Sequence, residues 1–275
     1  MTGSDMKELE ARGLVLLGCG KMGSAMLEGW LAQGLPVGSV WVNDPYPSDW
    51  LAGLEGLNLN ADLPDNPAIV LVAVKPQMMA DALPTLAAYG NGETLFLSVA
   101  AGTSIATYED MLGSETPIIR AMPNTPAAIA RGISAMCGND HATAGHLDMA
   151  QSLLSAVGQV VRLDGEHQMD AVTGVSGSGP AYVFHLIETL AAAGAAQGLS
   201  DELAMQLAKA TVAGAGALAM QADDDPAQLR VNVTSPGGTT AAALEVLMNE
   251  ENGFPALLNR AVAAAANRSK ELANG

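Results

Sequence analysis

Two threonines, Thr239 and Thr240, stand directly after a break formed by Pro236, Gly237 and Gly238. This SPGGTT segment interrupts a long run of Ala-rich, helix-forming residues. Pro ends the preceding helix, and Gly lets backbone N–H groups turn toward one point. The N-terminus of the next helix then favours an anion. In a chain of net charge −17, this pattern predicts a local site where backbone N–H groups hold an anionic ligand without a dedicated Arg.

A second candidate site is the glycine-rich sequence GCGKMG. Gly18, Gly20 and Gly23 spell GxGxxG after an apolar run and before a helical pattern. The first Gly permits a tight turn, the second lets the backbone approach a pyrophosphate, and the third allows close packing of helix on strand. The diphosphate would lie on the helix N-terminus. The motif predicts dinucleotide binding; the alternative is a glycine-rich turn without a ligand.

Asp44 ends the second predicted strand, about 20 residues after the glycine motif, where an acid bonds the adenosine ribose of NAD(H). An acid there repels a 2′-phosphate, and no Arg follows Asp44 before Arg120. These features favour NADH. Asp44 also precedes Pro45, and Asp-Pro initiates loops, so a turn role remains the alternative.

Short apolar runs alternate with helical stretches from residue 14 to about residue 163. The predicted strands are residues 14–17, 40–43, 69–74, 94–99, 118–122, 133–136 and 159–163, with helices over 22–33 and 77–88. The uninterrupted runs AIVLVAV and LFLSVA suit strands covered on both faces, hence a largely parallel sheet between helices. The expected fold class is α/β, with a Rossmann-like doubly wound domain over residues 1–164.

The remaining residues, 165–275, show helical periodicity and no strand signal. Helices are predicted over 182–197, 201–221, 226–231, 240–249 and 255–272. These segments are rich in Ala and Met and have too little bulk for an independent small core. We therefore expect an all-helical dimerisation and substrate domain that packs against a second copy of itself.

Composition excludes several other classes. The acidic chain, with only 12 Lys and Arg, argues against nucleic acid and against anionic membranes. Two Cys and four His without an HExxH pair indicate no metal site. The charged N-terminus lacks an apolar signal region, and residues 203–222 carry Gln206, Lys209 and Thr211, which indicates a buried or interface helix. The expected location is the cytoplasm.

Six motifs, taken together, resemble the pyrroline-5-carboxylate reductase family over residues 14 to about 260. They are GCGKMGSAMLEG, AVKPQ, SVAAG, RAMPNTPA, GVSGSGPAYVF and SPGGTTAAALEVL, in that order. The resemblance implies reduction of Δ1-pyrroline-5-carboxylate to L-proline by NADPH or NADH, the last step of proline biosynthesis. It also implies a Rossmann domain followed by a helical dimerisation domain, and a homodimer with shared active sites whose dimers assemble further.

The resemblance also implies roles for particular residues. On the cofactor side these are Gly18, Cys19, Gly20, Lys21, Met22, Gly23, Ala73, Val74, Lys75, Pro76, Val99, Ala100, Ala101, Met122, Pro123 and Asn124, joined by Asp44. On the substrate side they are Glu166, Asn232, Ser235, Gly238, Thr239 and Thr240. The chain departs from the family where Arg230-Val231 replaces the usual Lys-Asp. Asp44 also departs from the hydroxyl or basic residues frequent in members that prefer NADPH.

Imine reduction asks the protein mainly to position its reactants, because a protonated cyclic imine is already electrophilic. Thr240 is the catalytic candidate: its hydroxyl would bond the ring nitrogen and relay a proton, with helix N-capping as the alternative. Lys75 orients the nicotinamide end or the carboxylate, or is simply a solvated strand-end residue. Glu166 contacts the substrate amine or only charges a helix start.

Two other functions compete with imine reduction. Hydroxyacid dehydrogenases that pair a Rossmann domain with a helical domain place a catalytic Lys on the helix after the interdomain glycines. Here GSGPAYVFHLIE holds no Lys, and the next one is Lys209. A dinucleotide-binding protein without catalytic activity is the second alternative, and the sequence leaves it open.

Overall fold

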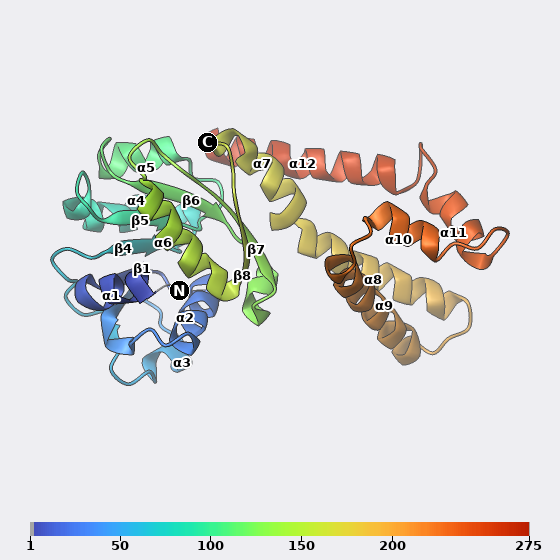
Figure 1. Ribbon diagram of the computed structural model, residues 1–275, viewed down its shortest axis with the longest axis horizontal. Coiled ribbons are helices and arrows are strands. Elements are labelled where there is room, and N and C mark those ends of the chain that lie inside the picture. The colour runs from blue at the N-terminus through green and yellow to red at the C-terminus, as the bar shows by residue number, and fades with distance from the viewer. Residues whose placement is uncertain (1–2, 275) are drawn as a thin grey trace. The chain divides into compact units, whose positions relative to one another are not determined.

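The computed structural model describes residues 3–274, without the side chains of Pro76 and Asn274 (Figure 1). It divides into two compact units, Met1–Gly177 with Ala265–Gly275, and Ser178–Ala264. The sequence places the domain boundary after residue 164 instead. Residues 165–177 pack with the first unit because their side chains bond to it, as Asp170 does by accepting a hydrogen bond from Ser269 (2.7 Å).

The first unit is built on an eight-stranded sheet of order β3-β2-β1-β4-β5-β6-β7-β8. Its strands are β1 Leu14–Leu17, β2 Val40–Asn43, β3 Asn58–Leu59, β4 Ile69–Val72, β5 Leu95–Ser98, β6 Ile118–Met122, β7 Gly132–Gly138 and β8 Gly158–Arg162. All neighbouring pairs are parallel except β6 with β7. The strand order reverses between β1 and β4, which is the switch point of a doubly wound sheet. All seven predicted strands are confirmed, and only the two-residue β3 was missed.

The central strands are buried on both faces, which explains their uninterrupted apolar sequence. Along β1, Leu14 and Leu16 enter one core cluster, while Val15 and Leu17 enter the other. Strands β4 and β5 alternate in the same way. Trp30, fully buried in the first cluster, donates its indole N–H to the carbonyl of Leu153 (2.9 Å) and so ties two helices together on that face.

The helices of the first unit are α1 Gly3–Arg12, α2 Lys21–Ala32, α3 Asp49–Ala52, α4 Met79–Ala82, α5 Ile105–Leu112, α6 Ala144–Leu154 and α7 Met169–Val172. The single helix predicted over 77–88 is wrong. It is divided into a 3₁₀ turn at Pro76–Met78, α4, and a second 3₁₀ segment at Leu83–Tyr89. Pro84 stands at the start of that last segment and lacks the N–H that a continuous α-helix would need there.

The second unit consists of helices α8 Gly179–Ala196, α9 Asp201–Gln221, α10 Pro226–Asn232, α11 Thr239–Leu247 and the first part of α12 Phe254–Asn274. All five helices were predicted. Ser200 accepts a hydrogen bond from the N–H of Leu203 and begins α9, as its sequence indicates. The buried apolar cluster of this unit holds only Ala191, Ala204 and Ala208. Among the described helices, α9 alone has the length and composition that would span a membrane.

Candidate functional site

The cofactor-side residues predicted from the sequence gather at one edge of the sheet. They directly follow β1, β2, β4, β5 and β6, which are mutually parallel, so all of these strands end at the same edge. Ligands of doubly wound sheets bind at this carboxyl edge, next to the switch point. Backbone hydrogen bonds link neighbouring strand ends there: the N–H of Gly18 donates to the carbonyl of Asn43 (2.8 Å), and the N–H of Ala73 donates to the carbonyl of Leu17 (2.9 Å).

The three glycines of the motif differ in how much space a side chain would have at each position. Gly18 has φ +84°, and a Cβ there would lie 2.8 Å from the Val74 side chain. A Cβ on Gly23 would lie 2.8 Å from the carbonyl oxygen of Gly18, so this position needs Gly for helix and strand to touch. Around Gly20, in contrast, a Cβ would meet nothing within 4 Å. The packing therefore accounts for the first and third glycines, and the second faces open space.

This open space lies at the N-terminus of α2. Gly20 is the N-cap of the helix, and no side chain caps it. The first N–H groups of a 12-residue helix therefore have no side-chain cap, and they form an anion site suited to a diphosphate. Lys21 is exposed and Met22 is partly buried beside it. The loop thus fits a dinucleotide.

Cys19 contributes its backbone to the loop, since its side chain is buried. Burial raises the pKa of the Cys19 thiol. The hydrogen bond with Ser24 lowers this pKa, and the negative charge of Asp44 raises it, both by smaller amounts. The thiol is therefore neutral at physiological pH. Its backbone N–H instead donates to the Oδ2 atom of Asp44 (2.7 Å), which joins the glycine loop to the end of β2.

Asp44 has the turn role that the sequence offers as one alternative, and its carboxylate also contacts the glycine loop. Its Oδ1 atom accepts from the N–H of Tyr46 (2.8 Å), the bond of an Asx turn that begins a loop. Its Oδ2 atom accepts a hydrogen bond from the backbone N–H of Cys19 in the glycine loop. Asn60 holds the Asp44 backbone by accepting from its N–H (2.9 Å) and donating to its carbonyl (2.9 Å). The carboxylate is therefore fixed at the rim of the candidate dinucleotide site.

The ends of β4, β5 and β6 complete this edge. Val74 is partly buried against Gly18, whereas Lys75 is exposed, as a solvated strand-end residue would be. Beyond β5, Val99 is partly buried, Ala100 is buried and Ala101 is exposed. The side chain of Pro76, also predicted here, lies outside the described part of the structure.

Residues after β6 bond to the segment that leads out of the first unit. Pro123 and Asn124 are buried. Asn124 accepts from the N–H of Ile133 (2.9 Å) and donates to the carbonyl of Ser176 (3.1 Å). Ser176 belongs to a π-helical turn, Thr173–Gly177, and such turns occur frequently at functional sites. A Cβ on Gly177 would lie only 2.6 Å from the Met122 methyl group, so this methyl group packs closely against Gly177.

Glu166 lies among first-unit residues. Its Oε1 atom accepts from Arg120 Nη1 (2.6 Å) and from the N–H of Ile105 (2.9 Å), the first residue of α5. This is the alternative in which Glu166 charges a helix start, although the helix is α5 and not its own. Sequence reasoning missed Arg120; the signal was an Arg inside the otherwise apolar strand IIRAM.

The other substrate-side residues lie in the second unit. Asn232 ends α10, Ser235 lies in the gap, Gly238 is the N-cap of α11, and Thr239 and Thr240 begin that helix. No side chain caps α11, so the N-capping alternative for Thr240 is wrong. Gly237 has φ +69°, the conformation expected of Gly in this break. The amide of Asn232 bonds to Gln228 (2.7 Å) and to Asp224 (3.0 Å).

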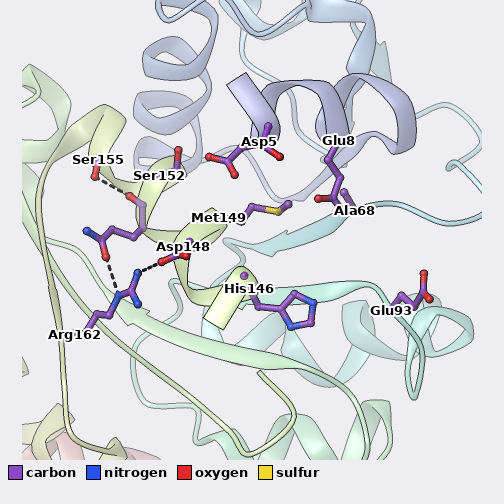
Figure 2. A pocket seen from close by; sticks show the side chains of 13 residues that line it. Asp5, Glu8, Ala68, Glu93, His146, Asp148, Met149, Ser152, Ser155 and Arg162 are labelled. Atoms are coloured by element: carbon purple, nitrogen blue, oxygen red, sulfur yellow. Dashed lines mark hydrogen bonds and ion pairs between the residues drawn. The ribbon is translucent and has the colours of Figure 1, made fainter. Parts of the chain in front are cut away.

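A surface cavity of about 860 Å³ lies at the opposite edge of the sheet. Ala68 and Glu93, which line it, precede β4 and β5. Figure 2 shows that α1 contributes Asp5 and Glu8 to the lining, and α6 contributes His146 and Met149. Arg162 bonds there to Asp148 and Gln151 (Figure 2). We place the candidate site at the carboxyl edge nevertheless, because the glycine loop, the helix N-terminus and Asp44 all lie there.

The sheet topology and the glycine loop define a dinucleotide-binding protein of the Rossmann type. Comparison with known proteins makes this more specific. A family model described as NADP oxidoreductase, coenzyme F420-dependent, matches residues 14–102, and one described as pyrroline-5-carboxylate reductase dimerisation matches residues 166–272. The chain is 40% identical over 265 residues to the pyrroline-5-carboxylate reductase of Pseudomonas aeruginosa, covering 94% of this chain and 96% of that protein.

Solved structures agree with this result. A pyrroline-5-carboxylate reductase from Coxiella burnetii superimposes with a TM-score of 0.88 at 33% identity, covering 95% of this chain and 98% of that one. The Plasmodium falciparum enzyme, solved with NADP bound, gives 0.83 at 31% identity, covering 96% and 99%. The chain belongs to the pyrroline-5-carboxylate reductase family. This result favours imine reduction over a hydroxyacid dehydrogenase.

Proposed function

We propose that the protein reduces Δ1-pyrroline-5-carboxylate to L-proline with NAD(P)H, the last step of proline biosynthesis. The observation that carries the proposal is an intact dinucleotide loop, with its uncapped helix N-terminus, in a chain that matches this family over nearly its whole length. The bound nicotinamide supplies the hydride that the imine carbon accepts. The residues of the chain hold and orient the two reactants.

The first unit would hold the cofactor along the carboxyl edge of its sheet. The α2 N-terminus holds the diphosphate, and residues 73–76 pass beside the dinucleotide. Val99, Ala100 and Ala101 line the nicotinamide side together with residues 122–124. These residues are largely apolar, so they exclude water from the reacting carbon without offering a competing nucleophile.

The second unit would hold the substrate at the SPGGTT break. The carboxylate is held by backbone N–H groups at the N-terminus of α11, with Asn232, Ser235, Gly238 and Thr239 beside it. The Thr240 hydroxyl would accept a hydrogen bond from the N–H of the protonated imine. Once the imine carbon has taken the hydride, the nitrogen lone pair would take up a proton from solvent, passed on through the Thr240 hydroxyl. Its hydroxyl is not used to cap α11, and this supports the assignment.

We also infer that the protein prefers NADH to NADPH. The carboxylate of Asp44 is fixed at the glycine loop by Cys19 and Tyr46, where it would accept hydrogen bonds from ribose hydroxyls. A 2′-phosphate would bring like charge against it. The Plasmodium falciparum relative was solved with NADP, so this preference would separate the present protein from that one.

The active form would be a homodimer, joined through the second unit, with active sites shared between subunits and with dimers that assemble further. Large apolar side chains are exposed over α8 and α9, among them Phe184 and Leu218, 62% and 54% exposed. A patch of this kind usually marks a protein interface. We place the enzyme in the cytoplasm, where a soluble biosynthetic reductase works.

The experiment that tests the proposal follows absorbance at 340 nm while NADH or NADPH is oxidised in the presence of pyrroline-5-carboxylate. We expect turnover with both cofactors and a higher kcat/KM with NADH. Proline-dependent reduction of NAD⁺ at high pH checks the reverse direction. If protein that demonstrably binds the nucleotide gives no turnover with either cofactor, the catalytic proposal is wrong and a non-catalytic binding protein takes its place.

A further inference from the structure

We infer that Glu166 is a positioning residue that acts through Arg120 and the N-terminus of α5 to fix the β5–α5 loop, residues 99–104. The inference rests on the proposed function, which places Val99, Ala100 and Ala101 beside the nicotinamide. It departs from the role that the family resemblance implies for Glu166, which is direct contact with the substrate.

Glu166 joins two parts of the first unit through one oxygen atom. Oε1 accepts from Arg120 Nη1 (2.6 Å) on β6 and from the N–H of Ile105 (2.9 Å), where the loop ends and α5 begins. A carboxylate at this position also favours the eight-residue helix α5 through its dipole. Both contacts hold the end of the loop against the sheet.

The beginning and middle of the loop are held as well. The N–H of Ala100 donates to Ser98 Oγ (3.2 Å), and that oxygen shares a second hydrogen bond with the hydroxyl of the fully buried Tyr108. Gly102 has φ +74°, and a Cβ there would lie 3.3 Å from the Leu272 side chain. Among residues 99–102, only Ala101 is exposed.

Charge makes Glu166 the essential member of this arrangement. Arg120 is 4% exposed and pairs in register with Ser98 on β5 and with Cys137 on β7. Burial raises the pKa of Cys137 to about 11, so its thiol stays neutral at pH 7. Among the described residues, Glu166 is the one carboxylate in an ion pair with Arg120. Without it, a buried guanidinium would be left without a counter-charge.

Two variants and one control test the inference. Glu166→Gln keeps an acceptor for the N–H of Ile105 and removes the charge, and Glu166→Ala removes both. Glu109→Gln is the matched control, because Glu109 lies on α5 and accepts from Asn139 (2.9 Å), away from the loop. Dissociation constants for NADH and for ADP-ribose, which lacks the nicotinamide, are measured without substrate, followed by kcat and KM.

If Glu166 positions the loop, both variants weaken NADH binding, by about threefold to tenfold, and leave ADP-ribose binding unchanged. The value of kcat falls about tenfold in Glu166→Gln and about a hundredfold in Glu166→Ala, since small displacements of reactants have effects of this size. Glu109→Gln stays within about twofold of the wild type.

Two results would overturn the inference. Unchanged NADH binding with a raised KM for pyrroline-5-carboxylate would make Glu166 a direct substrate ligand. Lowered thermal stability with unchanged binding and kcat would make it purely structural. The binding measurements need no turnover, so they test Glu166 even if the wild-type protein fails to reduce the imine; that failure would count against the proposed function alone.

Discussion

The two compact units differ sharply in what they bury. The first has two core clusters with large side chains such as Trp30, Phe96 and Tyr108, and fully buried central strands. The second buries a cluster of only Ala191, Ala204 and Ala208 within its own helices. A fully buried leucine contributes about 1.5–3 kcal/mol, and an alanine only a fraction of that. The first unit can therefore fold on its own core, whereas the second has little to hold it as a single copy.

The difference extends to the candidate site. In the first unit, the proposed cofactor residues lie at the ends of strands of one sheet, and two of them, Asp44 and Asn124, are held by side-chain hydrogen bonds. In the second, the SPGGTT break lies on exposed helices, and the hydroxyls of Thr239 and Thr240 do not cap α11. The cofactor half of the site is thus preorganised by the fold, and we expect the substrate half to depend on the dimer.

The largest expected effect comes from removing the partner. Leu207→Glu on α9, where Leu207 is 48% exposed, would bury a carboxylate in each copy of the proposed interface, at a cost of several kcal/mol. Glu supports a helix as well as Leu does, so the monomer keeps its secondary structure. We expect a monomer by light scattering and a loss of activity of about a hundredfold or more.

The matched control is Val161→Glu on the edge strand β8 of the first unit, where Val161 is 43% exposed. It places the same charge on a similarly exposed apolar residue, outside the helical unit. This variant should keep the oligomer mass and the activity of the wild type. A dimeric Leu207→Glu variant with full activity would contradict the contrast drawn between the two units.

The next largest effect is expected at Thr240. Thr240→Ala should lower kcat by about a hundredfold, the lower end of the range for loss of a proton-transfer group, and leave the NADH dissociation constant unchanged. Thr234→Ala is the control, because Thr234 directly precedes the SPGGTT break and its hydroxyl donates to the carbonyl of Arg230 in α10. An unchanged kcat/KM for Thr240→Ala would remove Thr240 from the mechanism.

The fold was largely predictable from the sequence because its signals are local. The β1 and α9 boundaries match the prediction, since an apolar run between glycines marks β1 and a Ser N-cap begins α9. Other elements carry weaker signals: α1 lies in a charged stretch, and β3 has only two residues. The break in the predicted helix over 77–88 depends on Pro84, whose effect the periodicity alone did not show.

The site was predictable in part, for the same reason. Residues that follow parallel strands must meet at one edge, so the positions of Asp44 and Ala100 followed from the strand pattern. The pairing of Glu166 with Arg120 did not, because the two residues are 46 positions apart and the motif RAMPNTPA, which begins at Arg120, does not show which residue Arg120 contacts. Side-chain pairs formed by tertiary packing leave no trace in local periodicity.

Asp44 gives the third prediction, and it tests how far the first unit alone sets cofactor choice. Asp44→Ser removes the charge beside the ribose and keeps a short side chain that can accept from Tyr46 or Cys19. The ratio of kcat/KM for NADPH to that for NADH should rise about tenfold, as expected when about 1.4 kcal/mol of discrimination is lost. An unchanged ratio would leave Asp44 as a turn residue only.

The smallest effect is expected at His146, which lies beside the cavity at the amino edge of the sheet (Figure 2). Burial lowers the pKa of His146 from 6.5, although the nearby Glu8 acts in the opposite direction. Because the folded state then binds the proton less readily than the unfolded chain, the stability contributed by neutral His146 is present above pH 6.5. It is lost as the pH falls below that value.

His146→Gln separates this titration from the structural role of the side chain. His146 completes a capping box by accepting from the N–H of Thr143 (3.2 Å), and Gln is a favoured residue at that position. The free energy of unfolding of the variant should match that of the wild type at pH 8. At pH 5 it should be higher, by less than about 1 kcal/mol, since solvent screens a partly exposed group. If the free energies of unfolding of the variant and the wild type differ by the same amount at pH 5 and pH 8, the protonation of His146 is not coupled to folding. Its kcat/KM should equal the wild-type value, because the cavity lies at the edge of the sheet opposite the glycine loop.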